Sequence, residues 1–96
     1  MKFGEFIKKE RIKKSILQRE LAAKLDIDTA YISKIENNEK LPKKQLAIEF
    51  GKVLGINLKF VETYWLKQKL MNQLVGEQYS INAIKLILKE FKENKD

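Results

Sequence analysis

The stretch QRELAAKLDIDTAYISKIENN, residues 18–38, decides the fold, because it contains two short helical patterns separated by an acidic turn. In the first pattern, Leu21, Ala22 and Leu25 recur at positions that share one face of an α-helix. This spacing predicts a helix from about Gln18 to Leu25. The helix is short, and the chain turns directly after it.

The sequence Asp-Ile-Asp predicts that turn, since aspartate tolerates the left-handed backbone conformation that a tight turn requires at Asp26. Asp28 is a favourable N-cap for a second helix, which we expect from about Thr29 to Asn37. Ile32 and Ile35 should face the core. The opposite side of the second helix is then left for the outside.

The rest of the chain is also predicted to be helical, because no sustained alternation of apolar and polar residues indicates a strand. Further helices are expected at about Lys2–Lys14, Lys43–Leu54, Leu58–Val75 and Ser80–Lys95. The first of these is expected to bury Phe3, Phe6, Ile7 and Ile12 and to leave Arg11 mostly outside.

The helix ends and the last helix have signals of their own. Asn38 and Gly55 are expected to end helices in the left-handed conformation, and Ser80 is expected to be an N-cap. In the last helix the apolar side chains cover an arc of about 160°, wider than the usual single stripe. A face this wide can pack against two neighbouring elements.

The charge of the chain favours nucleic acid as a partner. Its 96 residues have room for one core, and the formal net charge is +7. Residues 1–44 contain 12 basic and 7 acidic side chains, so the front half holds most of the basic excess. A basic excess attracts polyanions, although a lysine-rich solvated face has the same composition.

The chain contains no cysteine and no histidine, which excludes disulfides, the usual zinc sites and catalysis by Cys or His. No enzymatic activity, catalytic residue, metal or cofactor is therefore expected. No signal peptide is recognisable, and no apolar run reaches the roughly 18 residues of a membrane span. We expect a cytoplasmic protein with no membrane partner.

The longer stretch LQRELAAKLDIDTAYISKIENNEKLP resembles the core of the XRE or Cro/cI-type helix-turn-helix family. The matched positions are Gln18, Leu21, Ala22, Leu25, Ile27, Ile32, Ser33, Ile35, Glu36, Asn37 and Pro42. The resemblance implies an all-α, lambda-repressor-like helix-turn-helix domain of four to five short helices at residues 1–58. A C-terminal helical extension, residues 59–96, follows it. Leu17 departs from the family, which often has an N-capping threonine there.

The family resemblance implies a sequence-specific regulator of transcription, expected to be a repressor, whose second helix enters the major groove of double-stranded DNA. By similarity, the base-reading residues are Thr29, Ala30, Ser33 and Lys34. The residues expected at the DNA backbone are Gln18, Tyr31, Asn37, Lys40, Lys43, Lys44, Arg11 and Lys14; Tyr31 is equally suited to the core. Glu36 is interpreted as structural and paired with Arg11 or Arg19, because a carboxylate repels phosphates.

The extension is expected to form a homodimer, which would place two recognition helices about one DNA turn, roughly 34 Å, apart on an inverted-repeat operator. The alternative is that its apolar residues only complete the monomer core. Candidate interface residues are Val61, Trp65, Leu70, Leu74, Ile84, Leu88 and Phe91.

Three other functions compete with a repressor. An antitoxin would bind operator DNA and also a toxin protein through the extension. A scaffold would bind no DNA. A hydrolase would have to use Glu36 and Glu39, which are expected at a solvent-facing helix end without histidine or metal ligands.

Overall fold

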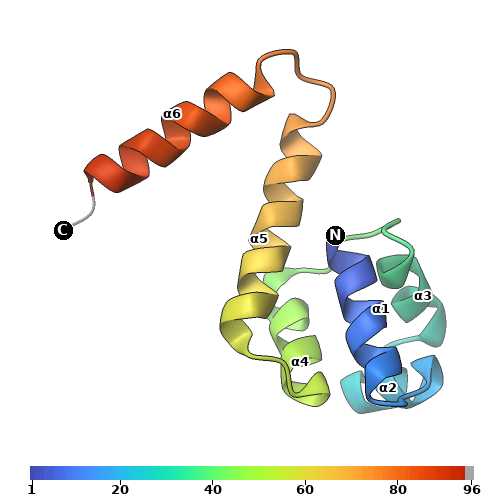
Figure 1. The fold of residues 1–96 in the computed structure, drawn as a ribbon. Helices are drawn as coiled ribbons and strands as arrows, with labels where there is room; N and C mark the ends of the chain where they lie inside the picture. Colours follow the sequence, from blue (N-terminus) through green and yellow to red (C-terminus); the bar gives the residue numbers. More distant parts are fainter. Residues whose placement is uncertain (95–96) are drawn as a thin grey trace.

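The computed structural model describes residues 1–94 and contains six helices in that part of the chain (Figure 1). Their bounds are α1 Phe3–Lys13, α2 Gln18–Leu25, α3 Thr29–Glu36, α4 Lys44–Leu54, α5 Leu58–Leu74 and α6 Ser80–Glu93. The all-α prediction is confirmed. The predicted end of the last helix near Lys95 lies outside the described residues.

The core lies between α1, α2, α3, α4 and the first half of α5. Helix α2 packs on α3, and α4 packs on α5. Its largest fully buried side chains include Phe3, Phe50, Ile7, Leu21, Ile32, Ile35, Leu54 and Val61. The apolar residues predicted to face inward in the two short helices around the turn therefore do so.

The prediction for the end of α1 was wrong at two residues. Ile12 is 56% exposed, whereas Arg11 is buried. At 100° per residue Ile12 lies half a turn from Phe3, while Arg11 lies on the Phe3 and Ile7 side of the helix. The inward position is therefore taken by a charged residue, which the apolar pattern alone does not indicate.

Three residues end helices in the left-handed conformation, as predicted. The φ angles of Asp26, Asn38 and Gly55 are +55°, +63° and +66°. Asp28 is at the N-cap position of α3, but its side chain makes no capping hydrogen bond. Ser80 is not an N-cap: it lies inside α6, and Tyr79 precedes that helix.

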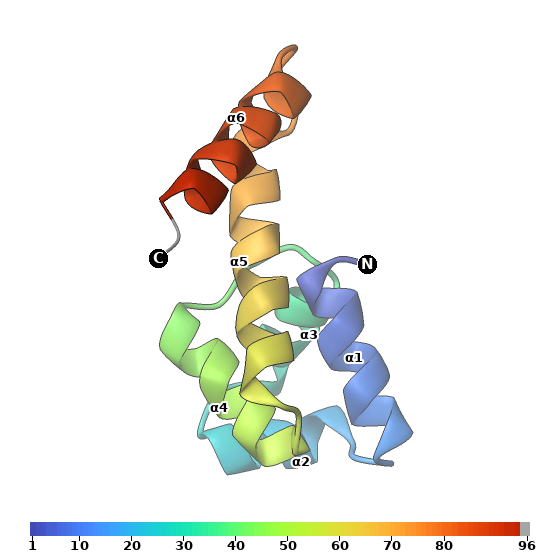
Figure 2. The same ribbon diagram turned by 60° about the vertical axis from the view of Figure 1, so that its left-hand side comes forward.

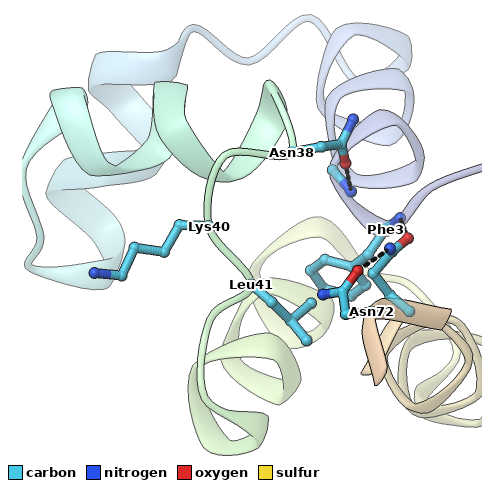
Figure 3. A pocket seen from close by; sticks show the side chains of 7 residues that line it. Phe3, Asn38, Lys40, Leu41 and Asn72 are labelled. Atoms are coloured by element: carbon cyan, nitrogen blue, oxygen red, sulfur yellow. Dashed lines mark hydrogen bonds between the residues drawn. The ribbon is translucent and has the colours of Figure 1, made fainter. Parts of the chain in front are cut away.

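The first turn of α1 is capped by residues distant in the sequence (Figure 3). Lys2 is the N-cap and provides no side-chain acceptor. The backbone N–H of Gly4 donates to Asn38 Oδ1 at 2.9 Å, and that of Phe3 donates to Gln68 Oε1 at 3.2 Å. Two of the N–H groups that a helix start leaves without intrahelical partners are thereby satisfied. The start of α1 is tied to the end of α3 and to the middle of α5.

Helix α5 has two different halves. Val61 and Trp65 in its first half are buried, and the indole N–H of Trp65 donates to the Pro42 carbonyl oxygen at 2.8 Å. Both residues were expected at a dimer interface, but they lie in the core of the chain. They are buried because α5 packs along α4 from its first turn.

The second half of α5 extends beyond the core and leads to α6, which stands apart from α1, α2, α3 and α4 (Figure 1 and Figure 2). No residue of α6 is buried. The two neighbours expected from its wide apolar arc are thus not provided by the described chain. No helix among residues 1–94 is both long and apolar enough to cross a membrane.

We predict that Asn38 stabilises the fold through its hydrogen bond to Gly4. Asn38→Gly keeps the left-handed conformation but removes the acceptor of the Gly4 N–H, and loss of this hydrogen bond should lower the free energy of unfolding by about 1 kcal/mol. Asn38→Asp keeps an acceptor beside the positive end of α1 and should stay within about 0.5 kcal/mol of the parent. Urea unfolding followed by circular dichroism measures both. Equal stability of the two variants would contradict the capping role.

Candidate nucleic-acid interface

Helix α3 presents two distinct faces. At 100° per residue, the four predicted base-reading residues and Asn37 fall within an arc of about 140°. Thr29, Ala30 and Lys34 are exposed, and Ser33 is half-buried. The opposite face holds Ile32, Ile35 and Glu36, all buried. The structure therefore places the predicted base-reading residues together on one accessible side, with an apolar anchor behind them.

The buried face of α3 is fixed by an ion pair. Arg11 Nε donates to Glu36 Oε2 at 2.7 Å, and a second guanidinium nitrogen donates to Oε1 at 3.0 Å. The remaining terminal nitrogen of Arg11 donates to the carbonyl oxygen of Ile16 at 2.7 Å. This two-pronged geometry is the strong form of arginine–carboxylate pairing. It connects the end of α1, the segment before α2 and the end of α3.

This ion pair settles two assignments. Glu36 is structural, as predicted, and its partner is Arg11; Arg19 is exposed. Arg11 was also expected to contact the DNA backbone, and that prediction was wrong, because its side chain is buried and donates from all three nitrogens within the protein. Glu36 does not face solvent, so it cannot form the exposed carboxylate pair with Glu39 that a hydrolase would need.

Gln18 at the start of α2 joins the same network. Its side-chain nitrogen donates to Glu36 Oε1 at 2.9 Å, which connects the start of α2 to the end of α3. The helix start itself has Leu17 as N-cap, whose side chain has no acceptor. Glu20 compensates by accepting a hydrogen bond from the Leu17 N–H at 2.9 Å. The phosphate contact assigned to Gln18 stays a prediction.

The lysines expected at the DNA backbone are accessible to different degrees. Lys40 and Lys43 are exposed in the connection between α3 and α4, and Lys40 extends away from Phe3 and Asn72 in Figure 3. Lys44 Nζ lies 3.3 Å from Glu62 Oε1, and Lys14 Nζ lies 3.5 Å from Glu10 Oε1. Exposed pairs of this kind contribute little and exchange readily for a phosphate.

Tyr31 borders the core instead of standing free. It is half-buried and packs against the buried apolar cluster. Asn37 is the exposed C-cap of α3, at the same end as Lys40. The Asn37 amide and Lys40 thus follow the C-terminal end of the helix that carries Thr29, Ala30, Ser33 and Lys34.

Burial of Glu36 changes the electrostatics of the motif. Residues 17–37 contain three basic and four acidic side chains, a formal charge of −1. The guanidinium of Arg11, from outside this segment, neutralises one of the four carboxylates inside the protein. The local charge is then balanced. The exposed lysines around it supply the positive potential that attracts a polyanion.

The hydrogen bonds by which Asn38 and Gln68 cap α1 were not predicted from the sequence. Both residues accept hydrogen bonds from the first turn of α1, and so connect α1 to the end of α3 and to α5. Their partners are 34 and 65 residues away, so no local pattern reveals them.

A family model described as helix-turn-helix matches residues 7–61. No curated protein and no solved structure matches the chain.

We predict that loss of Arg11 alone destabilises the fold more than loss of both Arg11 and Glu36. Arg11→Met leaves the buried Glu36 carboxylate without its cation, and should lower the free energy of unfolding by about 3–5 kcal/mol. Arg11→Met combined with Glu36→Leu removes both charges and should be more stable than the single variant.

Urea unfolding of these two variants measures the effect, with Arg19→Met as a matched control. Because Arg19 is exposed, its replacement should change the stability by no more than about 0.5 kcal/mol. A double variant less stable than Arg11→Met would show that the pair is not the origin of the loss.

Proposed function

The chain belongs to the helix-turn-helix family of XRE and Cro/cI-type regulators, and we propose that it represses transcription as a dimer on an inverted-repeat operator. Family membership gives the coarser function, which is sequence-specific DNA binding by a regulator of transcription. The repressor role, the dimer and the individual contacts are our proposal.

The observation that carries the proposal is the division of α3. Its buried face is fixed by Ile32, Ile35 and the Glu36 carboxylate, so the helix has one orientation on the domain. Its other face presents short polar side chains and one lysine. The major groove of B-DNA is wide enough to admit an α-helix. The base pairs present different hydrogen-bonding patterns there.

The proposed contacts divide by chemistry. Lys34 donates to guanine O6 or N7, Thr29 and Ser33 donate or accept, and Ala30 contacts a thymine methyl group. Gln18, Asn37 and the exposed lysines of the α3–α4 connection contact phosphates, and these contacts set the register of the helix without reading sequence. Arg11 has no part in the contacts.

Repression is the simplest consequence of such binding. Occupying an operator excludes other proteins from it and needs no further surface. A two-fold dimer would present two α3 helices to half-sites one DNA turn, about 34 Å, or a whole multiple apart.

We predict that selection from a random pool of duplexes at about 0.15 M salt enriches an inverted repeat. Salt at this level weakens the sequence-independent attraction of a basic protein for DNA, so enrichment reports base readout. The spacing of the half-sites is obtained from the same experiment. Binding that depends on salt but enriches no sequence would contradict the proposed function.

We predict further that Lys34 reads a base. Lys34→Ala should weaken binding to the selected duplex by about 1–3 kcal/mol and should relax the preference at one position of each half-site. Lys52→Ala removes another exposed lysine, from α4, and is the charge-matched control. Fluorescence anisotropy on the selected duplex and its single-position variants measures both. A uniform loss on all duplexes would assign Lys34 to a phosphate.

A further inference from the structure

Exposed apolar side chains gather on the second half of α5 and on α6. These segments lie far from α3 (Figures 1 and 2). The exposed side chains include six large apolar ones, each 40–74% exposed: Leu70, Ile81, Ile84, Ile87, Leu88 and Phe91. We call these six residues the arm face. Five of them follow one another along a single side of α6 at 100° per residue.

The arm face includes both a cleft and a ridge. Leu70, Met71 and Leu74 of α5 face Ile84 and Ile87 of α6 across an apolar cleft of about 180 Å³. Leu88 and Phe91 lie further along α6, outside the residues that line this cleft, and are 53% and 74% exposed. One chain thus carries a concave apolar site and a projecting apolar helix surface.

The arm face is at the upper end of the apolar patch sizes that monomers expose. With about 200 Å² for one large side chain, the six residues leave on the order of 600 Å² accessible. The largest apolar patch of a typical monomer is about 300–600 Å². Met71 beside the cleft is a further 51% exposed, so the patch approaches the roughly 800 Å² that each partner contributes to a stable interface.

Helix α6 also needs a packing partner to be stable. Helix α6 has 14 residues and no buried side chain. An isolated helix of this length is marginal in water, because most helical stability in proteins comes from packing of an apolar face. Its partner must therefore be a surface that packs along most of α6.

We propose that the arm face is the interface with a second copy of this chain, in which α6 of each copy packs across the α5–α6 cleft of the other. The inference rests on the proposed function and specifies how its dimer forms. Under two-fold symmetry, the ridge of each copy packs into the cleft of the other. This arrangement closes the assembly at two copies.

The charges beside the arm face favour a second copy over a foreign protein. On α6, Lys85 and Lys92 flank the edge next to Ile81, and Glu90 flanks the other edge next to Ile87. Both signs are therefore present at the rim. A rim of this kind offers no field of a single sign that would select a strongly acidic or basic partner.

The test is the mass of the full chain in solution. Sedimentation equilibrium at about 1–50 µM covers the range in which a complex with a micromolar dissociation constant forms. It should give twice the monomer mass of 11.3 kDa. Leu88→Gln combined with Phe91→Gln should weaken self-association at least a hundredfold. Glutamine is a good helix former, so the substitutions remove apolar surface without penalising the helix.

Leu86→Gln is the matched control, because Leu86 is 60% exposed on α6 but lies outside the apolar arc. It should leave the dimer unchanged, and circular dichroism and urea unfolding verify that all variants keep the folded core. A monomer at 50 µM would overturn the inference, as would an equal effect of Leu86→Gln and of the Leu88 and Phe91 substitutions.

The duplex selection separates failure of this inference from failure of the proposed function. A dimer that enriches no sequence supports the arm interface and contradicts the DNA-binding proposal. A monomer that enriches a single half-site contradicts the arm interface and leaves sequence-specific binding intact.

Discussion

The buried ion pair between Arg11 and Glu36 is the constraint on which the candidate interface depends. A carboxylate inside an apolar core is stable only with a cation and enough hydrogen-bond donors around it. Arg11 supplies both, and Gln18 adds a third donor. Because these donors come from α1 and α2, the position of α3 is defined relative to both. The pair therefore sets the orientation of α3, whatever its net contribution to the free energy of unfolding.

A second set of contacts connects this framework to the C-terminal helices. Asn38 follows α3, Gln68 lies in α5, and both accept hydrogen bonds from the first turn of α1. Trp65 adds a hydrogen bond to the connection between α3 and α4. The recognition helix and the first half of α5 are thus parts of one packed body.

The two halves of α5 show how one helix can serve two purposes. Val61 and Trp65 complete a small core, which needs every apolar residue it can bury. Beyond them, exposed apolar residues continue along the helix, with no covering element among residues 1–94, and α6 adds more. The proposed dimer explains this arrangement, because residues that only completed a monomer core would be buried already.

The sequence by itself determined the helical class, the bounds of α2 and α3 and the exposed face of α3. These features follow from local rules: apolar spacing, the left-handed conformation at Asp26 and Asn38, and the period of the helix. Only the tertiary structure decided that Arg11 turns inward, that Gln68 caps α1 and that Trp65 belongs to the core. Each of these depends on a partner 23 to 65 residues away. Such partners are brought together by packing, and helical periodicity contains no information about which distant residue will lie opposite.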